Sequence, residues 1–72
     1  MAILTLHVTG MHCASCGMLI DESLEELPGV ASSQTDVANE RTVVDHDPVV
    51  APPDSVATAI AELGYEAKRA DP

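Results

Sequence analysis

The sequence contains no phenylalanine and no tryptophan, and Tyr65 is its only aromatic residue. Without large rings, a hydrophobic core has to be built from Val, Ile, Leu, Ala and Met. The larger of these side chains contribute about 1.5–3 kcal/mol each when fully buried. A chain of 72 residues also buries only about 60% of the surface that it exposes when unfolded. We therefore expect a single, economical domain over residues 1–72, with its core formed by about residues 3–67.

Basic residues are scarce as well: three Lys and Arg stand against twelve Asp and Glu, and the formal net charge is −9. This shortage excludes the basic patch that nucleic-acid binding requires, and it disfavours docking to an anionic membrane. No apolar run reaches the roughly 18 residues that cross a membrane, and the opening residues lack the basic start of a signal peptide. We expect a cytoplasmic, mostly monomeric protein that is not membrane-embedded. Its acidic residues form either a plain solvated surface or a docking surface for a cationic partner.

Hydrophobic periodicity predicts six elements. In residues 2–8, Leu4, Leu6 and Val8 alternate with more polar positions, which is typical of a half-buried strand. Residues 14–27 place their apolar side chains on one helical stripe, which ends at Pro28-Gly29. The remaining predicted elements are strands over 30–37 and 41–47, a helix from about 54 to 63, and a strand over 65–69. This order predicts an α+β, ferredoxin-like fold, in which two helices cover one face of a four-stranded antiparallel sheet.

The only two cysteines, Cys13 and Cys16, lie where a loop is predicted to meet a helix. In a reducing cytoplasm such a pair is metal-binding or redox-active rather than structural. Thiolates select soft ions, namely Cu(I), Hg(II), Cd(II) and, as a borderline case, Zn(II), and a helix N-terminus stabilises the thiolate form. A closed zinc site requires four ligands, and His7, His12 and His46 are too scattered to complete one. We therefore expect one Cu(I) per chain, bound by the two thiolates.

The stretch Gly10-Met11-His12-Cys13-Ala14-Ser15-Cys16 resembles the Gly-Met-x-Cys-x-x-Cys signature of heavy-metal-associated domains. The similarity continues through Leu27-Pro28-Gly29-Val30, Asp47-Pro48 and Gly64-Tyr65, and it covers about residues 3–67. The resemblance implies a βαββαβ fold and the carriage of Cu(I). It also implies docking to a metal-binding domain of a copper-transporting P-type ATPase. An open two-thiolate site would pass the ion to such a partner by ligand exchange.

Three further residues near the cysteines receive expected roles. We expect Met11 to pack inward and anchor the metal loop rather than bind the ion, because Met fills irregular gaps well. His12 is either a third ligand or a plain exposed residue. The resemblance places Tyr65 beside the metal loop, where it would shield the thiolates or donate a hydrogen bond to sulfur. His7 and His46 are expected on the surface or in the sheet.

Some positions depart from the family pattern. Gly17 stands where the family has a larger residue, which predicts a looser helix. Ser33 and Thr35 replace Val residues, which predicts that their strand holds the core more weakly, and His46 replaces an aromatic residue.

The acidic residues of the first helix form a hypothetical docking surface for a basic partner: Asp21, Glu22, Glu25 and Glu26. The chain shows no set of nucleophile, base and orienting group, so we expect no enzymatic activity. A module of a copper-transporting ATPase and a carrier of Zn, Cd or Hg remain as alternatives. A thiol–disulfide oxidoreductase is a weaker one, because the chain is short and has no Trp beside the cysteine pair.

Overall fold

The computed structural model describes residues 2–12 and 14–70. The elements are β1 (Ala2–Thr9), α1 (Ala14–Glu25), β2 (Val30–Asp36), β3 (Arg41–His46), α2 (Pro53–Glu62) and β4 (Glu66–Arg69). Their order confirms the predicted ferredoxin-like α+β fold, and most boundaries lie within one residue of the prediction. The exception is α1, which ends two residues earlier than predicted, because Leu27 N–H bonds back to the carbonyl of Leu24 in a turn before Pro28. Within the described residues, neither helix is long and apolar enough to cross a membrane.

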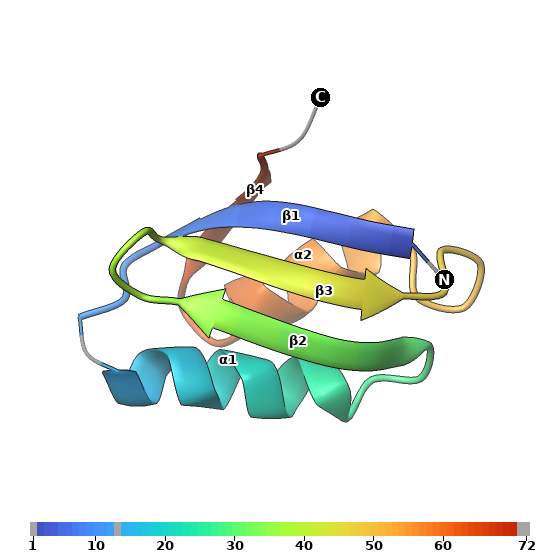
Figure 1. Cartoon of the computed structure of the whole chain (residues 1–72), viewed down its shortest axis with the longest axis horizontal. Helices are drawn as coiled ribbons and strands as arrows, with labels where there is room; N and C mark the ends of the chain where they lie inside the picture. The colour runs from blue at the N-terminus through green and yellow to red at the C-terminus, as the bar shows by residue number, and fades with distance from the viewer. Residues whose placement is uncertain (1, 13, 71–72) are drawn as a thin grey trace.

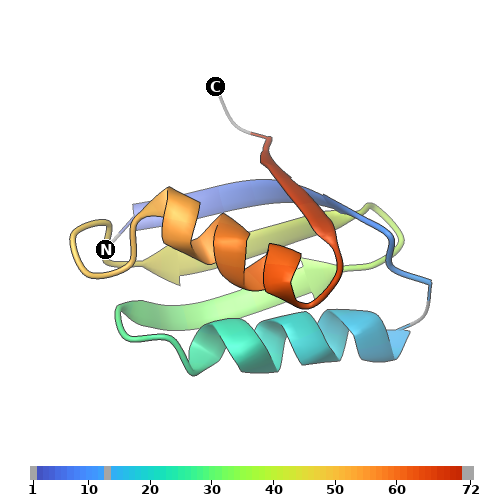
Figure 2. The ribbon, with the colours of Figure 1, turned by 180° about the vertical axis from the view of Figure 1, so that it is seen from behind.

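The four strands form one antiparallel sheet in the order β2-β3-β1-β4, so β2 and β4 are its edges. Figures 1 and 2 show both helices on the same face of this sheet. In β1 the predicted alternation is confirmed, because Leu4, Leu6 and Val8 are buried while Ile3 and His7 are exposed. The register pairs Leu4 with Val44 and Leu6 with Thr42, so β3 continues the buried surface of β1.

The core is aliphatic throughout the described residues. Helix α1 contributes Ile20 and Leu24, and α2 contributes Val56 and Ile60; all four are fully buried. The other buried apolar residues are Leu4, Leu6, Val8, Val44 and Ala51. The core therefore lies between the sheet and the two helices, as the sequence pattern predicted.

His46 lies in the sheet, as expected, but it faces inward and is only 2% exposed. Its Nδ1 donates a hydrogen bond to the carbonyl oxygen of Ala51 at 2.7 Å, because a carbonyl can only accept. This bond joins the end of β3 to the loop before α2. This loop lies beside the start of β1, since Ala2 pairs with His46 (Figure 1). Gly10 follows the opposite end of β1.

Helix α1 packs closely on β2 at Gly17, which is buried. A Cβ atom at this position would lie 2.9 Å from Cγ2 of Val37 and 3.2 Å from Cγ2 of Thr35. This close approach is a reason for glycine at position 17 that helix propensity does not give, and the looser helix stays a prediction. The missing side chain lets the helix approach the strand more closely than a Cβ atom would allow unless Val37 shifts.

Both polar side chains of β2 that replace the family's Val residues, Ser33 and Thr35, have hydrogen-bond partners on α1. The Ser33 hydroxyl, in a residue only 4% exposed, donates to Asp21 Oδ1 at 2.8 Å, and the Thr35 hydroxyl donates to the same oxygen at 2.7 Å. Since buried polar groups with partners avoid the cost of desolvation, these side chains bind α1 to β2 by hydrogen bonds instead of apolar packing.

Candidate metal centre

The loop after β1 begins at Gly10, whose φ of +96° lies in the left-handed region that favours glycine. Tyr65, which follows α2, lies against this residue: its Cδ1 atom would be 3.6 Å from a Cβ atom at Gly10. The half-buried Tyr65 also packs against the core. The phenol ring therefore supports the loop from the end of the second helix, the place that the resemblance implied.

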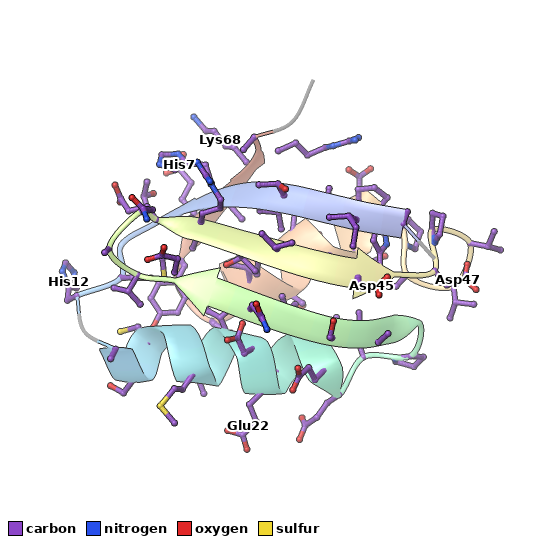
Figure 3. All side chains as sticks on the ribbon, viewed as in Figure 1. His7, His12, Glu22, Asp45, Asp47 and Lys68 are labelled. Atoms are coloured by element: carbon purple, nitrogen blue, oxygen red, sulfur yellow. The ribbon has the colours of Figure 1, made fainter. Side chains whose placement is uncertain are left out.

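Met11 and His12 point in opposite senses. Met11 is half-buried and packs against the core, so it ties the loop to the body of the domain. His12 is exposed, and Figure 3 shows its side chain directed away from the molecule at the loop end. Cys13 lies outside the described residues.

Cys16 lies in the first turn of α1 and is half-buried. Its neighbours Ala14 and Ser15 are small and exposed, so they leave the approach to the helix start uncrowded. The first N–H groups of a helix are not used by the helix itself, and its N-terminus carries a partial positive charge. Both effects stabilise a thiolate, which is the form that binds metals.

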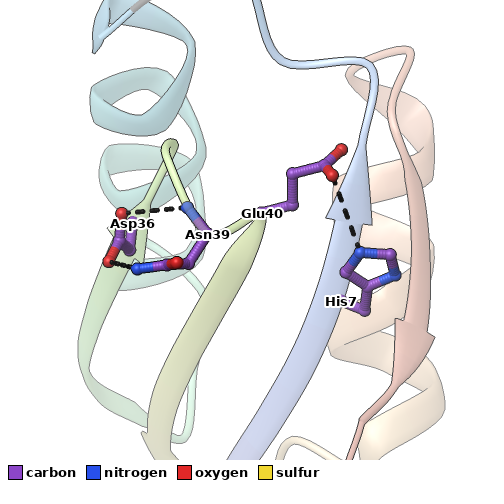
Figure 4. A network of polar contacts seen from close by, with 4 residues as sticks. All are labelled: His7, Asp36, Asn39 and Glu40. Carbon is purple, nitrogen blue, oxygen red and sulfur yellow. Dashed lines mark hydrogen bonds and ion pairs between the residues drawn. The ribbon is translucent and has the colours of Figure 1, made fainter.

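The histidines do not converge on Cys16. His7 lies on the sheet face away from the helices, with its Nε2 atom 3.9 Å from Glu40 Oε1 (Figure 4), and His46 is buried at the other end of the molecule. Among residues 2–12 and 14–70, no three His, Cys, Asp or Glu side chains gather where one ion could touch them all. The described residues therefore offer no ready-made four-ligand zinc site.

The turn between β2 and β3 lies near the end of β1 that leads to Gly10, since the Val8 N–H donates to the carbonyl of Glu40. Within it, the Asn39 side-chain amide donates to Asp36 Oδ2 at 2.7 Å, and the Asn39 backbone N–H donates to Oδ1 (Figure 4). These bonds, the side-chain one first, lower the pKa of Asp36 below its ordinary value of 3.8. The strand register brings the basic residues to this end as well, because Arg41 and Lys68 both pair with His7 and Arg69 pairs with Leu6.

The acidic group expected on α1 is divided by the structure. Asp21 and Glu25 turn toward β2, where they accept hydrogen bonds from Thr35 and Ser33. Glu22 and Glu26 are exposed, and Figure 3 shows Glu22 on the side of α1 away from the sheet. Two of the four acids of the predicted docking surface therefore also serve the fold, and the docking surface itself stays a prediction.

Comparison with known proteins adds a decisive finding to this geometry. The family model of the heavy-metal-associated domain matches residues 5–66. The chain belongs to the heavy-metal-associated domain family. The ferredoxin-like fold and the half-buried Cys16 at the start of a helix are thus found in a member of a metal-binding family.

Relatives of this heavy-metal-associated domain include a mercuric reductase and a copper-exporting P-type ATPase. A mercuric reductase from Serratia marcescens is 42% identical over 66 residues, which are 92% of this chain and 14% of the reductase. A copper-exporting P-type ATPase from Staphylococcus aureus (strain Newman) is 35% identical over 92% of this chain and 8% of the ATPase. The chain therefore spans only a small part of the curated relatives that it matches.

Solved structures of heavy-metal-associated domains share the whole fold. A copper-binding domain from HMA7, a P-type ATPase, is 27% identical with a TM-score of 0.95, covering 99% of this chain and 96% of that one. The CopZ metallochaperone is 25% identical with a TM-score of 0.88, covering 93% of this chain and all of that one (100%). Both similarities extend from β1 into the last strand.

Proposed function

We propose that this domain carries one Cu(I) ion on Cys13 and Cys16 and transfers it by ligand exchange to a metal-binding domain of a copper-transporting P-type ATPase. It would do so in the cytoplasm, as a binding protein without catalytic turnover. Zn(II) and other soft metals would be weaker occupants of the same pair. The same chemistry would serve if the domain were a module of such an ATPase. The match to a small part of a copper-exporting P-type ATPase fits this form of the proposal.

The observation that carries the proposal is the setting of Cys16. Its thiol is half-buried in the first turn of α1, where the helix stabilises a thiolate, and it follows Cys13 at the spacing that lets two sulfurs reach one ion. Two thiolates suit a soft ion of low coordination number, and Cu(I) is the usual one in a reducing compartment. Membership of the heavy-metal-associated family and the likeness to copper-binding domains support the same conclusion.

A second candidate, delivery of Hg(II) to a mercuric reductase, is favoured by one observation. The identity to the Serratia marcescens mercuric reductase is 42%, against 35% to the copper-exporting ATPase. Hg(II) is also a soft ion that two thiolates bind. The two candidates share the cysteine pair and differ in the protein that receives the ion.

Docking is proposed to use the exposed side of α1. Met18 is 70% exposed and Leu19 46%, next to the start of the helix, and the exposed Glu22 and Glu26 follow them. Such a surface fits a partner with an apolar contact bordered by basic residues. Replacing Glu22 and Glu26 by Lys should slow association with that partner at low salt. Asp54→Lys with Glu62→Lys on α2 makes the same change in net charge, so equal slowing by both pairs would contradict a specific docking face.

The proposal is tested by an anaerobic Cu(I) titration of the reduced protein against a chromogenic Cu(I) chelator, with Zn(II) and Hg(II) in parallel. The control is the double variant Cys13→Ser and Cys16→Ser. Sedimentation at each metal ratio detects a metal-linked dimer, in which the cysteine pairs of two chains would share the metal. One tight Cu(I) per chain, absent from the variant and not displaced by Zn(II), is the expected result.

The other outcomes are equally informative. Tight Zn(II) with weak Cu(I) would replace the proposal with a zinc or cadmium carrier. Transfer of Hg(II), but not of Cu(I), to the appropriate acceptor domain would favour the reductase candidate. No tight metal binding would contradict both candidates and leave the thiol–disulfide oxidoreductase.

A further inference from the structure

Helix α1 is attached to the edge strand β2 by a set of hydrogen bonds that we call the polar α1–β2 contact. Its members are Asp21, Glu25, Ser33, Thr35 and Thr42. Asp21 accepts three bonds: from the hydroxyls of Ser33 and Thr35 at Oδ1, and from the Thr35 backbone N–H at Oδ2, at 3.1 Å. Glu25 Oε2 accepts from the Ser33 backbone N–H at 3.2 Å.

The bonds extend from the helix into the sheet. Thr35 donates its hydroxyl hydrogen to Asp21, so the 2.9 Å bond between Thr35 Oγ1 and Thr42 Oγ1 has Thr42 as the donor. Thr42 is fully buried on β3. The Asp21 carboxylate is thus the acceptor at the end of a chain of hydroxyls that crosses two strands. Hydrogen bonds to a charged group are the stronger kind.

The spacing of these residues fixes the helix along the strand. Four helical residues rise about 6 Å, and two residues of a strand rise about 6.6 Å. Asp21 and Glu25 therefore match Thr35 and Ser33 in the opposite direction, and Gly17 continues the series at Val37. A shift of α1 along β2 by even one residue would break every bond, whereas apolar packing tolerates small sliding.

This contact lies close to the cysteine of α1. The first turn contributes no large buried side chain, because Ala14 and Ser15 are exposed and Gly17 has none. After the close approach at Gly17, Ile20 and Asp21 are the first residues whose side chains fasten the helix, and Asp21 lies about 7.5 Å along the axis from Cys16. Ile20 sets the distance of the helix from the core, and Asp21 is the hydrogen-bonding residue nearest to Cys16 among those that fix the helix along the strand.

We propose that Asp21 is a positioning residue for the metal site, which acts through the polar α1–β2 contact to fix where Cys16 presents its sulfur. This inference rests on the proposed function, because two sulfurs bind one ion tightly only when their separation suits it. Cys13 stands three residues before Cys16 in the sequence, and Cys16 belongs to α1. The separation of the two sulfurs therefore depends on where α1 lies relative to the sheet.

The test compares Cu(I) affinity, by chelator competition at neutral pH, in the reduced wild-type protein and three variants. Asp21→Ala removes the acceptor and should weaken binding about tenfold, as losses around metal ligands do. Asp21→Asn keeps a carbonyl oxygen for the two hydroxyls and should recover part of the affinity. Val56→Ala is the matched control, because it opens a cavity in the first turn of α2, away from the contact, and should change the affinity by less than about twofold.

A second readout needs no metal. Amide hydrogen exchange should be faster over residues 16–20 in Asp21→Ala and faster in α2 in Val56→Ala. Equal Cu(I) affinities of wild type and a folded Asp21→Ala would overturn the inference, as would equal losses in Asp21→Ala and Val56→Ala. If the wild type binds no Cu(I), the proposed function fails by itself. The exchange pattern then decides whether Asp21 positions the first turn, and unchanged exchange over residues 16–20 would overturn that too.

Discussion

Helices α1 and α2 cover the same face of the sheet, yet they are attached to it by different chemistry. Helix α2 packs with Val56 and Ile60 fully buried, and with Ala59 and Leu63 half-buried beside them. Helix α1 has two fully buried apolar residues as well, and it adds the directional bonds of the polar α1–β2 contact. Apolar contacts fix how far a helix lies from a sheet, and hydrogen bonds also fix its place along a strand. The more exact attachment belongs to the helix that carries Cys16.

The largest expected effect concerns the apolar helix. Ile60→Ala removes a fully buried side chain from α2 and should lower the free energy of unfolding by about 2–5 kcal/mol. Urea unfolding followed by circular dichroism measures this loss. Because no charge is involved, the loss should be the same at low and high salt. A strong salt dependence would show that α2 is also attached by polar bonds, which would break the contrast between the helices.

Asp21→Ala should cost about 1–3 kcal/mol in the same measurement, because it leaves the buried Ser33 hydroxyl without its acceptor. A second variant removes the hydroxyls too, as Ser33→Val, Thr35→Val and Thr42→Val in the Asp21→Ala background. Replacing both sides of a buried hydrogen bond by apolar groups is often nearly neutral, so this variant should recover most of the loss. If it instead loses more, the contact contributes more than the satisfaction of its own polar groups.

Gly17→Ala should destabilise the protein by about 1 kcal/mol. Alanine favours a helix over glycine by about 1 kcal/mol, but overpacking costs about 1–3 kcal/mol, and the new Cβ would lie 2.9 Å from Val37 Cγ2. Thr58→Ala, at an exposed position of α2, is the control and should stabilise slightly. A Gly17→Ala protein more stable than the wild type would mean that Val37 moves aside easily and that α1 is not tightly seated there.

The smallest effect lies in the turn that follows β2. Asn39→Ala removes the main cause of the lowered pKa of Asp36, so this pKa should rise toward 3.8. A lowered pKa adds stability that is present above the unfolded value and is lost as pH falls through the folded value. The wild type and the variant should therefore differ above about pH 3.8 and converge below it. NMR titration of the Asp36 carboxyl carbon measures the shift, and an unchanged pKa would exclude the Asn39 amide as its cause.

Local patterns sufficed to predict the fold. Burial follows the local sequence pattern in both kinds of element. It alternates along β1 at Leu4, Leu6 and Val8, and it recurs at helical spacing in α1 at Ile20 and Leu24. The inward turn of Met11 and the location of Tyr65 were expected from packing and from the resemblance. Cys13, one of the two expected ligands, lies outside the described residues, so the metal site itself stays a prediction.

The polar α1–β2 contact could not be predicted, because its members are far apart in the sequence. Ser33 and Thr35 looked like poor strand residues, and Asp21 looked like part of a solvated helix face, until the structure brought them to 2.8 Å and 2.7 Å. The same holds for Gly17, whose low helix propensity was visible while the approach of Val37 was not. Both contacts were missed because each residue was judged by its own helix or strand, while its partner lies on the neighbouring one.

The bond between His46 and Ala51 has a practical consequence. It ties down the base of the loop after β3, while Val49 at the tip of that loop is 86% exposed. An affinity tag or a fluorophore inserted at Val49 would therefore be held by a fixed base. The tag would project from the end of the molecule opposite Gly10 and the first turn of α1. A sensor chip could therefore display this domain in a single orientation, with the end that carries Cys16 facing the solution.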